Sequence, residues 1–520
     1  MNRLEMLNRV KSRRKVWDFI IIGGGATGVG CAVDAASRGF DVLLLEQSDF
    51  GKGTSSRSTK LVHGGVRYLA QGKFSLVREA LKERAILRRN AAHLVKTQSF
   101  IVPCYSLWRK FFYGAGLKIY NLLSGKYSFG KSKILSKTGT LEKLPNVKSE
   151  RLRGGVIYYD GQFDDARLLV DLAKTAAEQG AAILNYAPVV ELTKSENKID
   201  GVKFRDAETG EEYTQKARIV VNATGAFCDA IRRMSVEKSR KIIAPSQGVH
   251  LVFDEKFLPS ENALMIPKTS DNRVLFVIPW HGKTLIGTTD TPLETAKLEP
   301  RAFESEIEFI IETAAVYLQT PPQRKDILSV FAGIRPLVKN AKTKNTAALS
   351  RDHTIEFDES NLLTITGGKW TTYRRMAEDA VNRAIENADL PEKICATRYL
   401  KIHGSCEYSE AFGDLAIYGT DAVEIQNLIK ENPNTAERLH ADLPYCAAEI
   451  VWAMRNEMAR TLEDVLARRT RALFLNASAA IEIAPKAAEI MARESGENKI
   501  WLNEQIEKFI ELAKIYQNKS

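Results

Sequence analysis

Residues 58–67 read STKLVHGGVR and combine three side chains that could do chemistry with a pair of glycines. The imidazole of His63 can take up or release a proton near neutral pH. Lys60 and Arg67 can attract an anion, since both side chains carry a positive charge. Gly64 and Gly65 would let the backbone come close to a bound molecule. These residue types make the stretch a candidate for chemistry, and which chemistry depends on the elements that position it.

The preceding segment predicts a dinucleotide-binding βαβ unit. A short apolar run at 18–22 leads into GGGATG at 23–28, then into a helical stretch of small residues that ends at Gly39. A second apolar run, 42–45, ends on Glu46. In such a unit the glycines let the backbone approach a pyrophosphate, the N–H groups of the helix N-terminus meet its charge, and the acid accepts hydrogen bonds from a ribose hydroxyl.

Two later segments favour FAD over a nicotinamide cofactor. The strand RIVVN at 218–222 opens into Ala-Thr-Gly at 223–225, and the strand at 362–366 opens into Gly-Gly-Lys at 367–369, ahead of a helical pattern over 371–387. A nicotinamide cofactor exchanges through an open cleft, whereas FAD is held along its length by segments far apart in the sequence. Lys369 and the positive end of the following helix would stabilise negative charge on a reduced flavin.

The remaining patterns define the fold class that we expect. Apolar runs alternate with turn residues between 248 and 287, which predicts an antiparallel sheet that roofs the site, and Ala, Glu, Leu and Arg dominate after Pro391. We therefore expect an α/β protein with three parts. These are a Rossmann-like FAD-binding domain (17–95, 151–245 and 330–390), an antiparallel-sheet substrate or cap domain (96–150 and 246–329), and a C-terminal α-helical domain (392–520).

The charge distribution points to an anionic surface. The chain carries a formal net charge of +11, and residues 84–141 contain no Asp or Glu. Within this stretch, residues 104–129 interleave large aromatic side chains with Lys and Arg, as a helix lying in an anionic membrane interface would need. The alternative is a cap-domain helix that packs on its own sheet. We expect neither a membrane-spanning helix nor a secretory signal, because no apolar run is long enough.

Other site classes find little support. Six cysteines are scattered without CxxC spacing, which argues against a zinc site or a redox motif and suits a reducing compartment, so we expect no metal. The basic balance also fits a flavin-containing nucleic-acid-binding protein, but no recognised nucleic-acid module is present. We therefore expect no nucleic-acid partner.

Six stretches in this order resemble the FAD-dependent glycerol-3-phosphate dehydrogenases: GGGATGVGCAVDAASRG, SSRSTKLVHGGVRYL, VIPWHGKTLIGTTD, FAGIRPL, LSRDHTIE and TGGKWTTYR. The resemblance spans essentially the whole chain. It implies tightly bound FAD, oxidation of sn-glycerol 3-phosphate to dihydroxyacetone phosphate, and transfer of the electrons to the quinone pool. The alternative is the oxidase branch, which uses O₂ and releases hydrogen peroxide.

The resemblance further implies a cytoplasmic protein that binds peripherally to the anionic inner face of the cell membrane, and it allows a homodimer. The mitochondrial members carry calcium-binding EF-hands, whereas this sequence contains no such loop, so we expect no calcium control.

Oxidation of a secondary alcohol phosphate needs a base for the hydroxyl proton and fixed cations for the phosphate. The implied catalytic candidates are His63, Arg67, Arg335 and Lys369. His63 is the first choice for the base, and the alternative is that His63 only packs against the flavin. The implied substrate-binding set is Arg67, Tyr68, Arg335, Arg351 and Lys369. The implied cofactor-binding set is Gly23, Gly25, Ala26, Thr27, Gly28, Glu46, Gln47, Thr54, Ser55, Ser58, Lys60, His63, Val190, Ala223, Thr224, Gly225, Gly368, Lys369 and Thr371. His250, Thr289 and Asp290 are expected in the roof of the pocket without a catalytic role.

Overall fold

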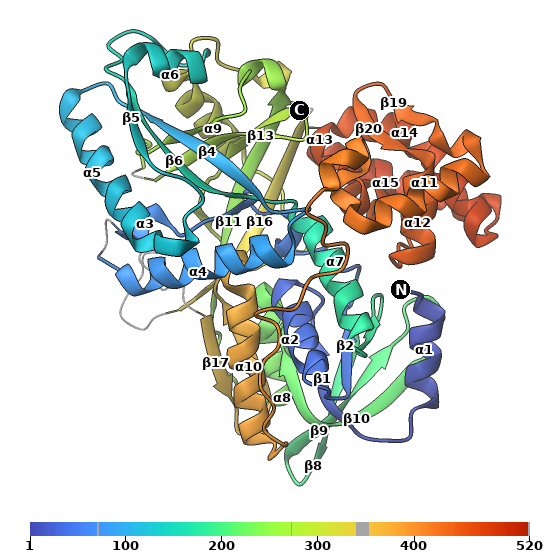
Figure 1. Ribbon diagram of the computed structural model, residues 1–520. Helices are drawn as coiled ribbons and strands as arrows, with labels where there is room; N and C mark the ends of the chain where they lie inside the picture. Colours follow the sequence, from blue (N-terminus) through green and yellow to red (C-terminus); the bar gives the residue numbers. More distant parts are fainter. Residues whose placement is uncertain (70–71, 272, 340–352, 518–520) are drawn as a thin grey trace.

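The computed structural model describes residues 1–69, 72–271, 273–339 and 353–517. Figure 1 shows two large sheets in the body of the molecule, with a helical C-terminal domain beside them. This arrangement confirms the predicted fold class.

The first sheet has eight strands and a parallel centre, in the order β17-β18-β10-β1-β2-β7, with β8 and β9 attached beside β10. β1 pairs in parallel with both β10 and β2, and the apolar residues of β2 are buried throughout. Such runs form the middle of a sheet that is covered on both faces. The strands are β1 (Trp17–Ile22), β2 (Val42–Leu45), β7 (Ala182–Leu184), β8 (Val189–Ser195), β9 (Lys198–Arg205), β10 (Glu212–Asn222), β17 (His353–Phe357) and β18 (Leu363–Gly367).

Helices cover this sheet and place its glycine-rich turn. α2 packs against both α7 and α10, and its small residues allow the close approach. At Gly30 of α2, an added Cβ would lie 3.0 Å from the ring of Tyr373 in α10. The helices around this sheet are α1 (Arg3–Ser12), α2 (Ala26–Ser37), α7 (Asp165–Glu178), α8 (Cys228–Ser235) and α10 (Tyr373–Asn387).

The second sheet has ten mostly antiparallel strands, in the order β15-β11-β14-β13-β12-β4-β6-β3, with β16 on β11 and β5 on β6. Its strands are β3 (Leu61–Val62), β4 (Lys96–Pro103), β5 (Lys133–Leu135), β6 (Gly155–Gln162), β11 (Ile243–Asp254), β12 (Ala263–Ile266), β13 (Leu275–Trp280), β14 (Lys283–Gly287), β15 (Thr291–Pro292) and β16 (Ser329–Val338). Its helices are α3 (Val66–Leu69), α4 (Phe74–Asn90), α5 (Leu107–Ser124), α6 (Lys137–Lys143) and α9 (Glu304–Tyr317).

The strands divide between the sheets differently from the predicted domain boundaries. β6 and β16 belong to the second sheet, although 151–245 and 330–390 were assigned to the FAD-binding domain. β6 pairs along the whole of β4, and β16 pairs along β11 from Ser329 to Val338. An apolar strand pattern shows that a segment is a strand, but it does not show which sheet the strand joins.

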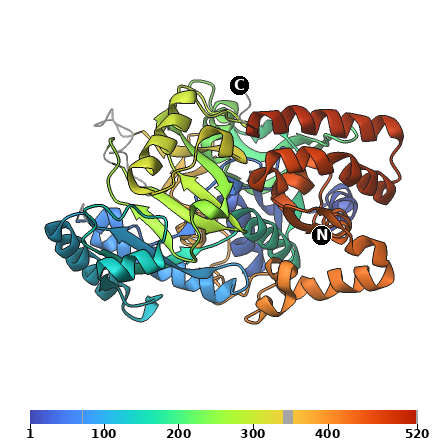
Figure 2. The same cartoon turned by 90° about the horizontal axis from the view of Figure 1, so that it is seen from above.

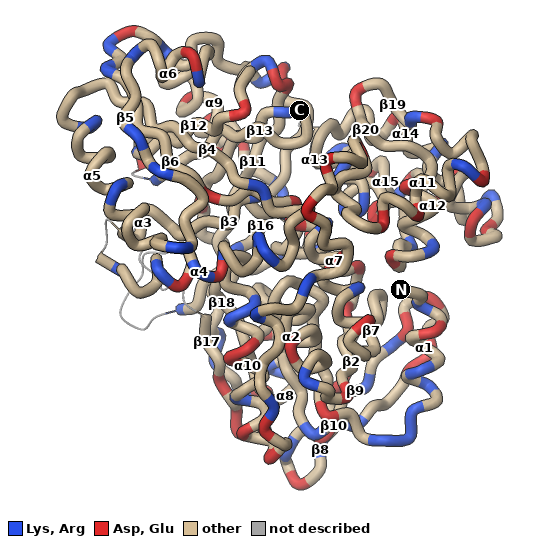
Figure 3. The backbone as a smooth tube through the Cα atoms, viewed as in Figure 1, with Lys and Arg blue, Asp and Glu red and all other residues tan. Residues whose placement is uncertain are grey.

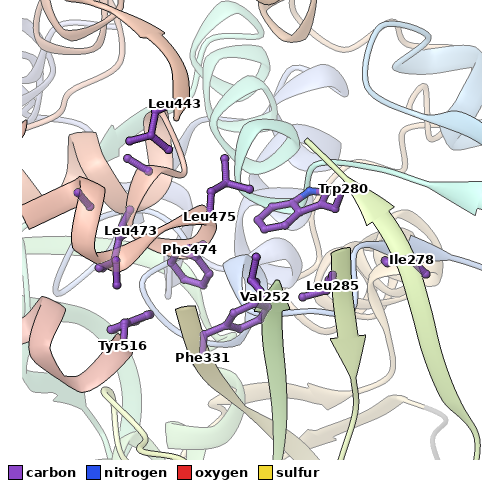
Figure 4. Close-up of a cluster of buried hydrophobic side chains, with 14 of the residues drawn as sticks. Val252, Ile278, Trp280, Leu285, Phe331, Leu443, Leu473, Phe474, Leu475 and Tyr516 are labelled. Carbon is purple, nitrogen blue, oxygen red and sulfur yellow. The ribbon is translucent and has the colours of Figure 1, made fainter. Parts of the chain in front are cut away.

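The C-terminal domain is helical, as predicted, and it shares a core with the second sheet. Figure 4 shows Phe474 and Tyr516 of this domain packed with Phe331 and Val252 from β16 and β11, and all four belong to one buried cluster. The helices lie together on one side of the molecule (Figure 2). They are α11 (Ala422–Glu431), α12 (Ala447–Asn456), α13 (Ala472–Leu475), α14 (Ala477–Ser495) and α15 (Lys499–Tyr516), joined by the short hairpin of β19 (Arg438–His440) and β20 (Leu443–Cys446).

Candidate functional site

A cavity of about 340 Å³ opens at the carboxyl ends of β1, β2, β10 and β18. Ligands of open α/β sheets bind at this edge. Its wall is formed by the turn before α2, by Glu46 and Gln47 after β2, by residues 223–227 after β10, and by residues 367–370 after β18. The three segments that the sequence singled out for FAD therefore meet in one place.

The backbone of this cavity fits the pyrophosphate of a dinucleotide. Gly25 caps the N-terminus of α2 without a side-chain hydrogen bond, and the first turn of the helix holds no acid. A Cβ on Gly28 would lie 1.9 Å from the carbonyl oxygen of Gly23, so the turn needs glycine there. At Gly53 and Gly225, which both line the cavity, an added Cβ would meet no atom within 4 Å. The glycines thus leave open space in front of a positive helix end.

Glu46 is held at the wall of this cavity by the backbone. Its carboxylate accepts hydrogen bonds from the N–H groups of Gly24 at 2.5 Å and Ser48 at 2.9 Å. Burial raises the pKa of Glu46, and the two backbone hydrogen bonds oppose that rise. A carboxylate fixed in this way keeps acceptor capacity for a ribose hydroxyl.

A second cavity, of about 320 Å³, lies between the first cavity and the second sheet. Its lining includes His63, Tyr68, His250 and Arg335. The two cavities share one wall, which consists of Thr54, Pro336, Gly367, Gly368, Lys369 and Trp370. A cofactor bound in the first cavity would therefore border a substrate bound in the second.

Arg335 is fixed in the wall of the second cavity by hydrogen bonds to the protein. One terminal nitrogen donates to the carbonyl oxygen of Gln247 at 3.2 Å and lies 3.4 Å from the carboxylate of Asp290. The other terminal nitrogen donates to the hydroxyl of Thr288 at 3.1 Å and to the carbonyl oxygen of Thr289 at 2.9 Å. A Cβ on Gly248 would lie 2.5 Å from this guanidinium. The charge is thus held in one position, partly balanced by Asp290.

Two imidazoles line the second cavity. His250 is buried and stacks on Phe331, and its Nε2 lies 2.9 Å from the hydroxyl oxygen of Thr59. Burial, with the nearby charges of Lys60 and Arg335, holds the pKa of His250 well below its ordinary value, so this ring is neutral at pH 7. His63 is half-buried, and its backbone N–H donates to the hydroxyl of Thr371 at 3.2 Å.

The paired glycines serve packing as well as access. The N–H of Gly64 donates to the hydroxyl of Tyr120 at 2.9 Å, and a Cβ there would lie 2.4 Å from that oxygen. Gly65 has a φ of +75° and lines the second cavity, where Lys369 places its ammonium group 3.9 Å from the ring centre of Tyr68.

Most of the predicted residues line one of the two cavities. The first cavity is lined by Gly23, Gly25, Ala26, Thr27, Glu46, Gln47, Thr54, Ser55, Ala223, Thr224, Gly225, Gly368 and Lys369. The second is lined by Ser58, His63, Tyr68, Thr371, Arg335 and Lys369, together with the expected roof residues His250, Thr289 and Asp290. Arg67 stands in α3, but its side chain lies outside the described part of the structure, and Arg351 lies outside the described residues.

Three residues predicted to bind the cofactor line neither cavity, so their roles stay predictions. Gly28 packs against Gly23 and lines neither cavity. Val189 rather than Val190 lines the first cavity, at a point where the pairing of β8 with β9 shifts register between Val189 and Glu191. Lys60 is fully buried, and its ammonium group bonds to Asp165 instead of facing either cavity.

Two residues that line the cavities were not predicted from the sequence. Trp370 belongs to the shared wall, and its indole N–H donates to the carbonyl oxygen of Ser55 at 2.8 Å; the GGKWTTYR stretch was the available signal. Arg273 lines the second cavity and pairs with Asp271 at 2.7 Å, in a turn that carries no sequence signature. Among the described residues, no group of three or more His, Cys, Asp or Glu side chains is placed to hold a metal ion.

Comparison with known proteins agrees with this geometry. The family model "FAD dependent oxidoreductase" matches residues 18–374, and the model "C-terminal domain of alpha-glycerophosphate oxidase" matches residues 365–500. The mitochondrial glycerol-3-phosphate dehydrogenase of Arabidopsis thaliana is 39% identical over 96% of this chain and 86% of its own length. The probable mitochondrial enzyme of Caenorhabditis elegans is 41% identical over 96% of this chain and 73% of its own length.

The chain belongs to the FAD-dependent glycerol-3-phosphate dehydrogenases. The resemblance seen in the sequence is thus confirmed, and this glycerol-3-phosphate dehydrogenase family member is an FAD-dependent oxidoreductase. A solved structure of the glycerol-3-phosphate dehydrogenase from Bacillus halodurans, complexed with FAD, is similar over 99% of this chain and 98% of that chain, with a TM-score of 0.81 and 30% identity. The L-alpha-glycerophosphate oxidase of Mycoplasma pneumoniae shares the fold, with a TM-score of 0.55 and 17% identity over 72% of this chain and 95% of that chain.

Proposed function

We propose that this chain oxidises sn-glycerol 3-phosphate to dihydroxyacetone phosphate, with FAD supplying the hydride acceptor, and that the electrons pass on to a membrane quinone. The observation that carries the proposal is the shared wall of the two cavities. Gly368 and Lys369 border the cavity that fits a dinucleotide, and they also border the cavity that holds His63 and Arg335. One anionic alcohol and one flavin can therefore lie in contact.

The residues of the second cavity suit a small phosphate ester. Arg335 brings a guanidinium that is held by Gln247, Thr288 and Thr289, and Lys369 brings an ammonium group from the shared wall. Fixed cations bind phosphate without first having to be ordered, which lowers the entropy cost of binding. Roles for Arg67 and Arg351 in phosphate binding stay predictions.

His63 is our candidate for the base that removes the hydroxyl proton, because it lines the cavity beside the shared wall. The neutral ring of His250 is the second candidate, but its Nε2 is already engaged with the hydroxyl of Thr59. Single-turnover bleaching of the bound flavin tests the choice. We expect His63→Ala to slow bleaching by about 100-fold or more, as removal of a general base does. A rate within twofold of wild type would reject His63 as the base.

The electron acceptor is tested in the same apparatus. After the flavin has been reduced by glycerol 3-phosphate, we expect a soluble quinone to reoxidise it much faster than O₂ does. Stoichiometric hydrogen peroxide in air without quinone would instead support the oxidase branch, and it would overturn the quinone part of the proposal while leaving glycerol 3-phosphate as the substrate.

We further propose that α5 contacts an anionic membrane on the cytoplasmic face. The helix begins at the cap Ser106 and buries Leu117 and Tyr120 against the protein, so the packing alternative holds for one of its faces. The apolar side chains that remain exposed are Leu107, Trp108, Phe111, Phe112, Ile119 and Leu122, with exposed fractions of 59, 78, 64, 60, 47 and 81%. The surrounding segment carries Lys and Arg without acids (Figure 3), which suits anionic headgroups.

Liposome flotation tests this surface. We expect the triple variant Trp108→Ser/Phe111→Ser/Phe112→Ser to lose most of its binding to anionic vesicles. Ile500→Ser is the matched control, because Ile500 is 70% exposed on α15 in the C-terminal domain. Equal binding of the triple variant and the control would reject the assignment. In the described part of the chain no helix is long and apolar enough to cross a membrane. A homodimer stays a prediction.

A further inference from the structure

One loop, residues 54–60, forms part of both cavities. Thr54 and Ser55 line the first cavity, while Thr54, Ser58 and Thr59 line the second. The loop also places two neighbours of the site. The hydroxyl of Ser55 accepts from the N–H of Ala26 at 2.9 Å, and the hydroxyl of Thr59 lies 2.9 Å from Nε2 of His250. A shift of this loop would therefore disturb cofactor and substrate contacts together.

The back of the loop rests on a buried carboxylate. Asp165, at the start of α7, accepts hydrogen bonds from the backbone N–H of Ser58 at 2.9 Å and from its hydroxyl at 2.7 Å. The ammonium group of Lys60 bonds to both oxygens of the same carboxylate at 2.7 and 2.8 Å, and to the carbonyl oxygen of Ser56 at 2.8 Å. Both charged side chains are fully buried. Such a network needs every partner, because an uncompensated buried charge is strongly destabilising.

Arg471 of the C-terminal domain completes this network from the other side. It precedes α13, it is 1% exposed, and its φ is +70°, in the left-handed region that a non-glycine residue rarely adopts. One terminal nitrogen donates to the carbonyl oxygen of Ser56 at 2.8 Å and lies 3.3 Å from Asp165; the other donates to the carbonyl oxygen of Ala467 at 2.9 Å. The C-terminal domain thus reaches the loop with the guanidinium of Arg471 and with the ring of Phe474, whose centre lies 5.5 Å from the ammonium group of Lys60.

The surroundings of Arg471 leave it few other positions. Its guanidinium lies 4.2 Å from the ring centre of Phe474 and 5.5 Å from that of Trp280, both in the shared core of Figure 4. A planar guanidinium can bond to a carbonyl and a carboxylate at once while it stacks on aromatic rings, and a lysine cannot reproduce this.

We propose that Arg471 is a positioning residue for the oxidation: through Ser56 and Asp165 it holds loop 54–60 in the conformation that forms both cavities. The C-terminal domain then contributes to the reaction although α11–α15 line neither cavity. The inference rests on the proposed function only in that glycerol 3-phosphate is the substrate of the assay.

The test compares Arg471→Met and Arg471→Lys in the full-length flavoprotein. Arg455→Met is the matched control, because Arg455 forms an exposed pair with Glu494 in the same domain. Activity is expressed per bound flavin, below the melting temperature of each variant, so that a loss of stability alone leaves kcat/KM unchanged. Since displacement of reacting groups by about 1 Å can cost roughly 100-fold, we expect Arg471→Met to lower kcat/KM for glycerol 3-phosphate about 10- to 100-fold, and Arg471→Lys to lower it less.

If Arg471→Met has a kcat/KM for glycerol 3-phosphate within twofold of wild type, the proposal is overturned, whatever the melting temperature of the variant. If that variant does not fold, Arg471→Lys is combined with Thr59→Val, which removes the hydroxyl that faces His250. If Arg471 acts through the loop, the fold-loss in kcat/KM of the double variant should be smaller than the product of the two single fold-losses, because both changes affect the same element. Independent, multiplicative losses would overturn the proposal. Activity of the wild-type enzyme on glycerol 3-phosphate reports on the proposed function separately.

Discussion

Replacement of Arg335 by Ala and by Lys would separate charge from positioning in the second cavity. The Arg335 side chain is 25% exposed, and both terminal nitrogens of its guanidinium already donate to protein oxygens. The guanidinium of Arg335 therefore stabilises a bound phosphate ester mainly through one fixed positive charge. The carboxylate of Asp290, at 3.4 Å, partly offsets that charge. One hydrogen bond to a charged group contributes about 1.5 to 3 kcal/mol, which corresponds to about 10- to 140-fold in kcat/KM.

The assay compares glycerol 3-phosphate with glycerol, which lacks the phosphate. We expect Arg335→Ala to lower kcat/KM about 10- to 140-fold for the phosphate ester and less than about threefold for glycerol. Arg335→Lys keeps the charge but loses the contacts to Thr288 and Thr289, so its loss should be smaller. Retention of bound flavin and an unchanged melting temperature are the controls. Equal losses on both substrates would show that Arg335 only supports the cavity wall, and the reasoning above would be refuted.

Two further predictions use matched comparisons. We expect Gly225→Val to lose FAD on desalting and Gly210→Val to keep it. Both glycines have a positive φ and open space at Cβ, so both substitutions strain the backbone, but only Gly225 lines the first cavity. A similar flavin content in the two variants would contradict that geometry. His403 is partly buried, which lowers its pKa, but hydrogen bonds to Asp421 and Glu178 outweigh burial and raise the pKa from 6.5 to about 9. A raised pKa stabilises the fold below pH 6.5, and this stabilisation is lost as the pH rises through about 9. The free energy of unfolding of wild type should therefore exceed that of His403→Gln by about 3 kcal/mol at pH 6, and the difference should vanish by about pH 10. A difference that does not depend on pH would contradict the raised pKa of His403.

The local elements and the cofactor cavity could be predicted from the sequence because their signals are local. An apolar run, a glycine-rich turn and an acid at the end of the next run define β1, α2, β2 and Glu46 within one short stretch. Two further strand patterns, which end in Ala-Thr-Gly at 223–225 and Gly-Gly-Lys at 367–369, added the distant segments that follow β10 and β18. Most of the residues predicted to bind the cofactor line one cavity.

The positions that the sequence could not place depend on distant partners. Lys60 lies among residues that line the cavities, yet its ammonium group bonds to Asp165, and this pair holds its side chain at the back of the loop. Val189 and Val190 lie where the pairing of β8 with β9 shifts register, which interrupts the alternation of faces that a strand pattern assumes. The sheet that β6 joins depends on its pairing with β4, which a single strand pattern does not encode.

The wall between the two cavities limits how this enzyme can be changed. Thr54, Pro336 and residues 367–370 border both cavities, so we expect a substitution there that widens the substrate range to alter also how firmly the cofactor is kept. Substrate range and flavin retention are therefore separable only at positions such as Tyr68 or Phe276, which border the second cavity alone. Efforts to direct the enzyme to other alcohols should begin there.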